Sequence, residues 1–163
     1  MAQTYKMNVD HIKLQEFARG FKFNETEDQI TCLNEVFNDL SSAKPMDRLI
    51  CGDVGFGKTE IALRASFISS LNNFKVLIIA PTTLLANQHY KNFKERLHNY
   101  TNVELITRNT TKSNKSNILK KFESNISNIL IGTHALLSLK FSDINLGLIV
   151  VDEEQHFGVA QKE

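Results

Sequence analysis

The most restrictive feature of this sequence is a glycine-rich segment, GDVGFGKT (52–59), between a short apolar run and an amphipathic helical pattern. It matches the pattern G-x-x-x-x-G-K-[ST] of phosphate-binding loops. Glycines let the backbone curl so that successive N–H groups point at a phosphate, and the following helix adds the positive end of its dipole. The segment therefore predicts a strand, a nucleotide-binding loop and a helix in succession. An ordinary glycine-rich turn would explain the glycines but not the Lys-Thr pair.

Two side chains of this segment have specific expected roles. Lys58 is suited to place a charge on the β- and γ-phosphates, and the Thr59 hydroxyl is suited to bind Mg²⁺. We therefore predict that the chain binds ATP with Mg²⁺. The residues expected to contact the nucleotide are Gly52, Asp53, Val54, Gly55, Phe56, Gly57, Lys58 and Thr59.

A second chemical feature lies about a hundred residues downstream, where the apolar run LIVV (148–151) leads directly into acidic residues. An apolar strand that ends this way places carboxylates at the carboxyl edge of a sheet, where open α/β folds bind ligands. Asp152 is the candidate for Mg²⁺ coordination, and Glu153 for orienting or deprotonating the attacking water. A solvated acidic turn is the alternative, and Glu154 fits that description.

The order of apolar patterns predicts the fold class. Thr26 to Ser41 has helical spacing and a capping-box match between Thr26 and Gln29. Beyond it, expected strands at 49–51, 76–80, 103–106, 128–132 and 146–151 alternate with expected helices from Lys58, from Leu84, ending near Phe122, and from His134. This alternation predicts a parallel β-sheet with helices on both faces. We expect 109–116 to be a flexible loop and 1–20 to be a weakly patterned lead-in segment.

Bulk composition narrows the function classes. The sequence has nineteen Lys and Arg residues and eighteen Asp and Glu residues, which gives a net charge of +1. This small net charge predicts that any contact with DNA is made through a local part of the surface. Cys32 and Cys51 form no C-x-x-C pair, which argues against a zinc site and fits a reducing cytoplasm. No apolar run approaches the length of a membrane span, so no membrane association is expected.

Four segments together resemble superfamily 2 helicase-type motors, and among them the bacterial transcription-repair coupling factor family. They are MDRLICGDVGFGKTE (46–60), PTTLLANQHY (81–90), ILIGTHALL (129–137) and VDEEQHFGV (151–159). The resemblance covers Phe21 to Glu163 and implies a RecA-like lobe over 21–163, the first of two motor lobes. RecG-type fork-remodelling helicases share the general pattern, but Phe56 and the double threonine fit the coupling factors better.

The resemblance extends the expected nucleotide contacts to Glu60, at the end of GDVGFGKTE, and to an adenine-recognition motif upstream. There Gln29 pairs with the base and Phe23 stacks on it or flanks it. The alternatives are that Gln29 only completes the capping box and that Phe23 belongs to the core.

The resemblance also implies contacts with double-stranded DNA. Thr82, Thr83, Thr133 and His134 follow two of the expected strands, in loops that hold the phosphate backbone in this family. Arg108 is a weaker candidate, and a solvated loop charge is its alternative. For Thr83 and Thr133 the alternative is helix N-capping, which is compatible with anion binding.

One position departs from the family. Gln155 stands where related motors commonly have a histidine that couples the nucleotide state to the DNA-binding loops, although a glutamine also donates and accepts hydrogen bonds.

In the intact protein, the resemblance implies an ATP hydrolase and DNA translocase that removes stalled RNA polymerase and couples transcription to excision repair. RNA polymerase and excision-repair proteins are expected to bind domains outside this chain. Without a second lobe, we expect weak nucleotide binding and almost no hydrolysis. A nucleotide-switched binding module and a P-loop phosphotransferase are the rival classes.

Overall fold

The computed structural model describes residues 6–22, 24–42, 56–141 and 144–152. Phe56 and Gly57 are described only through the helical backbone to which they belong. Several predicted features lie outside the described residues: the strand at 49–51, Gly52, Asp53, Val54 and Gly55 of the loop, Phe23, Glu153, Glu154 and Gln155.

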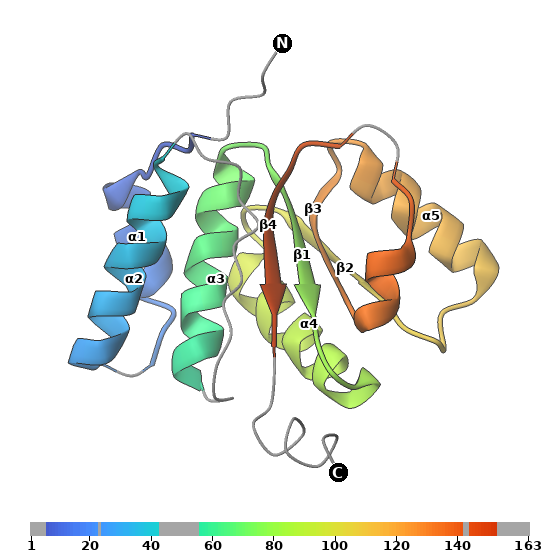
Figure 1. Ribbon diagram of the computed structural model, residues 1–163, viewed down its shortest axis with the longest axis horizontal. Helices are drawn as coiled ribbons and strands as arrows, with labels where there is room; N and C mark the ends of the chain where they lie inside the picture. Colours follow the sequence, from blue (N-terminus) through green and yellow to red (C-terminus); the bar gives the residue numbers. More distant parts are fainter. Residues whose placement is uncertain (1–5, 23, 43–55, 142–143, 153–163) are drawn as a thin grey trace.

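The centre of the fold is a four-stranded sheet in the order β2-β3-β1-β4, and all of its neighbouring strands are parallel (Figure 1). The strands are β1 (Lys75–Ile79), β2 (Asn102–Ile106), β3 (Ser127–Gly132) and β4 (Leu146–Val151). The central strands β1 and β3 are buried at nearly every position, as strands covered on both faces require, whereas β2, at one end of the strand order, carries the polar residues Asn102 and Glu104. The predicted parallel sheet is confirmed, as are the four predicted strands within the described residues.

Helices cover both faces of the sheet, as predicted (Figure 1). Val76 and Ile78 of β1 point into the larger core, which they share with α3 (Phe56–Leu71) and α4 (Thr83–Leu97). Leu77 and Ile79 of the same strand point into a smaller core on the opposite face. That second core is closed by α5 (Lys112–Glu123) and by η1 (His134–Ser138), a 3₁₀ helix. The alternation of side chains along one strand thus builds two cores.

Two further helices, α1 (His11–Ala18) and α2 (Glu27–Leu40), pack against α3. The predicted helix at 26–41 is confirmed with Thr26 as its N-cap. The weakly patterned lead-in contains α1, which the pattern did not reveal because few of its side chains are buried. Asp10 caps it, and Phe17 is buried and stacks on Phe67 with ring centroids 4.4 Å apart.

The predicted flexible loop at 109–116 is wrong over much of its length, because α5 begins at Lys112. The Thr111 hydroxyl accepts a hydrogen bond from the Asn114 N–H and so caps the helix. Polar composition suggested a loop here, but the first turns of α5 are exposed and need no apolar side chains. The predicted helical end near Phe122 is confirmed.

Candidate active site

The first turn of α3 lies at the carboxyl edge of the sheet. In Figure 1, α3 begins at the end of the molecule where the arrows of β1 and β4 finish. Lys58 and Thr59 belong to this turn and are partly exposed. Backbone N–H groups in the first turn of a helix have no intrahelical partner and carry the positive end of the dipole. This end of the sheet is therefore suited to an anionic ligand beside a lysine and a hydroxyl group.

Asp152 reaches the same edge from β4. Its backbone N–H donates to the Ile79 carbonyl at 2.8 Å, so the first acidic residue is tied to the end of β1. Its carboxylate Oδ2 lies 2.6 Å from Nε2 of His89 on α4, and both side chains are nearly buried, with exposed fractions of 13% and 11%. The structure thus places the predicted metal-binding carboxylate at the predicted edge.

His89 was not singled out from the sequence as a functional residue. It shares the buried stripe of α4 with Ala86, Phe93 and Leu97, at helical spacing. A histidine among apolar residues on one face of a helix was the available signal, but its partner, Asp152, follows β4 and lies 63 residues away in the sequence.

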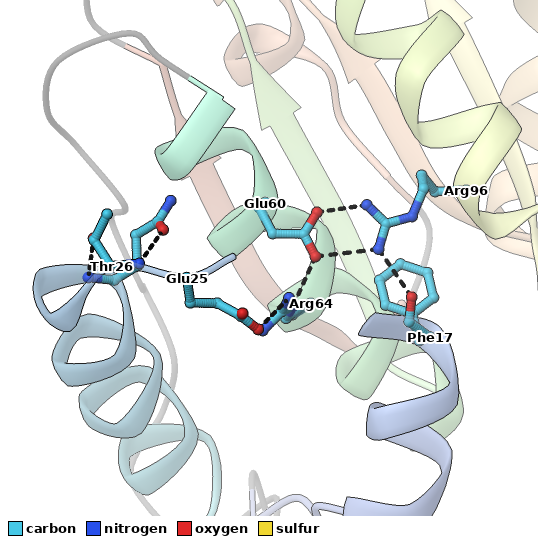
Figure 2. A network of polar contacts seen from close by, with 7 residues as sticks. Phe17, Glu25, Thr26, Glu60, Arg64 and Arg96 are labelled. Atoms are coloured by element: carbon cyan, nitrogen blue, oxygen red, sulfur yellow. Dashed lines mark hydrogen bonds and ion pairs between the residues drawn. The ribbon is translucent and has the colours of Figure 1, made fainter. Parts of the chain in front are cut away.

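Glu60 forms the centre of a buried ion-pair cluster (Figure 2). Its side chain is 2% exposed, with Oε1 2.5 Å from Nη1 of Arg96 and Oε2 2.7 Å from Nε of Arg64. Arg64 also donates to Glu25 at 3.0 Å, and Arg96 donates to the Phe17 carbonyl at 3.0 Å. The cluster connects α1, α3, α4 and the segment before α2. The predicted contact between Glu60 and the nucleotide stays a prediction.

The outer member of this cluster has a shifted pKa. A backbone hydrogen bond at Glu25, assisted by the Arg64 guanidinium, holds the pKa of the Glu25 carboxyl below its ordinary value of 4.5, although partial burial opposes the shift. Glu25 is therefore ionised at neutral pH and contributes to the balance of charge around Arg64.

A cavity of about 230 Å³ borders the first turn of α3. Its lining includes Thr59 and Glu60 of α3, Phe21 and Lys22 from the segment between α1 and α2, and Arg96 of α4. The Cζ atom of Arg64 also lies over the ring of Phe21, 5.6 Å from the centroid of that ring.

Gln29, a predicted adenine contact, forms the capping box: its Oε1 accepts from the Thr26 N–H at 2.8 Å, and its own N–H donates to the Thr26 hydroxyl at 3.1 Å. Gln29 therefore has the capping role that was its alternative, and contact between Gln29 and the base stays a prediction.

Thr82 and Thr83 lie where α4 leaves the end of β1. The N-cap is Thr82, whose hydroxyl accepts from the Leu85 N–H at 3.1 Å. The capping role considered for Thr83 is wrong, because Thr83 is already the first helical residue. Thr133 occupies the N-cap position of η1, but its side chain makes no capping hydrogen bond.

The ends of β2 and β3 surround a smaller cavity of about 150 Å³, lined by Thr107, Arg108, Lys115 and Thr133 together with apolar side chains. The structure thus brings two of the predicted DNA contacts, Arg108 and Thr133, into one cavity. It adds Lys115, which the sequence analysis did not select. His134, the first residue of η1, is exposed at the same edge.

No described helix has both the length and the apolar character needed to cross a membrane. In the part of the chain that the structure describes, no three or more His, Cys, Asp and Glu side chains gather closely enough to hold a metal ion.

Comparison with known proteins shows extensive similarity to one group of relatives. The chain is 47% identical to the transcription-repair-coupling factor of Haemophilus influenzae over 98% of the chain and 14% of that protein. It is 49% identical to the Borreliella burgdorferi protein of the same name over 90% of the chain and 13% of that protein. The chain thus spans only about a seventh of these relatives. The resemblance predicted from the motifs is confirmed.

A solved structure of RecG bound to a three-way DNA junction matches with a TM-score of 0.76 and 28% identity, over 91% of this chain and 24% of that one. This likeness supports the predicted RecA-like α/β lobe. The sequence profile of DEAD/DEAH box helicases matches residues 26–163. Because that match covers most of the sequence, the chain belongs to the DEAD/DEAH box helicase family.

Proposed function

We propose that this chain is the ATP-binding lobe of a double-stranded DNA translocase that removes stalled RNA polymerase and couples transcription to nucleotide excision repair. The observation that carries the proposal is that Lys58 and Thr59, on the first turn of α3, and Asp152, directly after β4, lie at the same edge of a parallel sheet. Ligands of open α/β folds bind at this edge. Similarity to transcription-repair-coupling factors supports the choice of reaction.

The described side chains fit a magnesium-bound nucleotide. The Thr59 hydroxyl and the Asp152 carboxylate are hard oxygen donors, and Mg²⁺ is commonly held by one or two carboxylates together with substrate phosphates and water. Bound Mg²⁺ would neutralise charge that develops on the phosphates. In this proposal, Lys58 holds the β- and γ-phosphates, Glu153 orients the attacking water, and Gln155 couples the nucleotide state to DNA.

DNA binding is assigned to the same edge of the sheet, beside the nucleotide. Thr82, Thr83, Thr133 and His134 would contact the phosphate backbone through hydroxyl groups and helix N-termini. Arg108 and Lys115 add positive charge beside Thr133, in one cavity. The RecG structure matched above holds a DNA junction, which supports DNA as the ligand. Contacts of this kind do not depend on base sequence.

The first experiment measures binding of a fluorescent ATP analogue with Mg²⁺ to the chain, with Lys58→Ala as the variant. We expect saturable binding that the substitution weakens at least tenfold. Lys121→Ala is the matched control, because Lys121 is an exposed lysine near the end of α5. Equal weakening by both substitutions would contradict a specific role for Lys58. Absence of binding by a folded wild-type chain would refute a preassembled nucleotide site.

RecG-like fork remodelling is the second candidate function, because the RecG structure covers most of the chain. The two functions differ in their substrate. A protein that joins this chain to a second motor lobe and docking domains is expected to displace stalled RNA polymerase from duplex DNA in an ATP-dependent manner. Branch migration of a forked DNA without displacement of polymerase would favour the RecG-like function. DNA-independent hydrolysis would favour a phosphotransferase or a switched binding module.

A further inference from the structure

His89 lies on the buried face of α4, and 9% of the whole residue is exposed. Its ring meets Phe93 edge-on, with centroids 6.3 Å apart, which restricts the orientation of the imidazole. The Nε2 atom points to the end of β4, where it lies 2.6 Å from Oδ2 of Asp152. A buried histidine whose neighbours are largely apolar is therefore aimed at one carboxylate oxygen.

Asp152 is held from two elements at once. Its backbone N–H is bonded to β1 through the Ile79 carbonyl, and its side chain is bonded to α4 through His89. A carboxylate has two oxygens with several lone-pair positions, so a hydrogen bond accepted by Oδ2 leaves the lone pairs of Oδ1 able to bind a metal ion. The backbone bond sets where the residue lies, and the histidine bond sets which way its carboxylate turns.

We propose that His89 is a positioning residue for Asp152, and that its Nε2–H hydrogen bond orients the carboxylate for magnesium binding. This inference rests on the proposed function, because it takes Asp152 as a ligand of nucleotide-bound Mg²⁺. Carboxylates that bind metals are themselves commonly hydrogen-bonded, and loss of such a partner typically costs about 10- to 100-fold in metal affinity. The competing explanation is that the pair only fastens α4 to β4.

His89→Gln and His89→Met form a matched pair for this test. Glutamine and methionine have unbranched side chains of similar length, but only glutamine offers an N–H donor near the position of Nε2. Methionine fills irregular apolar space well, which limits the packing loss beside Phe93. His89→Phe is a second donor-free variant that keeps an aromatic ring. Melting curves of all three variants establish that they are folded.

The readout is the affinity for a non-hydrolysable ATP analogue, measured by calorimetry in the full chain with Mg²⁺ and again with EDTA. The magnesium-dependent gain is the ratio of the affinity with Mg²⁺ to the affinity in EDTA. We expect this gain to be about tenfold or more smaller in H89M than in the wild type, while the affinity in EDTA stays as in the wild type. H89Q is expected to recover most of that gain. If H89M proves unstable, H89F takes its place in the comparison.

Two results would overturn the positioning role. The first is an unchanged magnesium-dependent gain in folded H89M or H89F. The second is an equal loss of nucleotide affinity with Mg²⁺ and with EDTA, because a pair that only fastens α4 to β4 would affect both affinities alike. Failure of the proposed function has a different signature, because the wild type itself would then show no binding that depends on Lys58. Wild-type binding that depends on Lys58 but not on Mg²⁺ would overturn the inference while leaving the nucleotide site intact.

Discussion

Replacing Glu60 with alanine is expected to lower the free energy of unfolding by about 3 kcal/mol. Removal of one member of a buried ion pair typically costs about 3–5 kcal/mol, because the partner is left charged in a poorly solvated place. Here two guanidinium groups lose their shared carboxylate, and their side chains are only 6% and 16% exposed. Such a loss is a large fraction of the roughly 5–15 kcal/mol that stabilises a typical domain.

The remaining contacts place the expected loss at the lower end of that range. Arg64 keeps its ion pair with Glu25, and Arg96 keeps its hydrogen bond to the Phe17 carbonyl. The Arg96 guanidinium also lies 4.5 Å from the centroid of the Phe17 ring. These partners compensate part of the charge on each arginine, so neither is left entirely without a favourable contact.

Urea unfolding followed by circular dichroism measures this change as a lower transition midpoint at an unchanged m-value. In a thermal scan, we expect the melting temperature to fall by about 6–12 °C for a domain of this size. Glu95→Ala is the control, because Glu95 is an exposed glutamate on α4 and its removal should stay within about 0.5 kcal/mol. A loss below about 1 kcal/mol for Glu60→Ala would refute the reasoning, since the arginines would then reach solvent at little cost.

Three further predictions concern the ends of the strands. Burial lowers the pKa of Lys75 from its ordinary 10.5, so the unfolded chain binds this proton more tightly than the folded chain. The stability of the wild type relative to Lys75→Met should therefore rise with pH as pH approaches 10.5. The free energies of unfolding of both proteins, measured in urea at several pH values, test this, and a difference between them that does not change with pH would contradict it. Gly132→Ala places a Cβ 2.6 Å from the Ile106 carbonyl oxygen and should lower the free energy of unfolding by about 1–3 kcal/mol. An unchanged midpoint in thermal or urea unfolding would contradict this close packing. Thr82→Ala should cost about 1 kcal/mol through loss of the α4 cap, whereas Thr83→Ala should cost little; equal losses in urea unfolding would argue against Thr82 as the cap.

Much of the fold was predictable from local pattern. The run VLII (76–79) is apolar at every position, which suits a strand buried on both faces, and all of β1 is buried. Thr26 and Gln29 predicted a capping box that the structure contains. Such features depend on a few neighbouring residues, so their energetics can be judged without knowing the rest of the chain.

Other features were missed because their cause lies elsewhere in the molecule. The helix α1 is short, and its position depends on Phe17 stacking against Phe67 of α3. The start of α5 is polar and exposed, which resembles a loop until the Thr111 cap is seen. In both cases composition was a poor guide, because helix formation was decided by one cap or one distant contact.

The sequence by itself determined the parallel α/β class, the nucleotide-loop motif and the position of Asp152 after an apolar strand, since each follows from order and spacing along the chain. Only the tertiary structure decided that His89 meets Asp152, that Glu60 is shared by Arg64 and Arg96, and that Arg108 and Lys115 share a cavity with Thr133. The physical reason is that partners in a buried polar contact are selected by packing. Side chains far apart in sequence meet because their helices and strands bury apolar faces together, and the polar groups brought along must then pair.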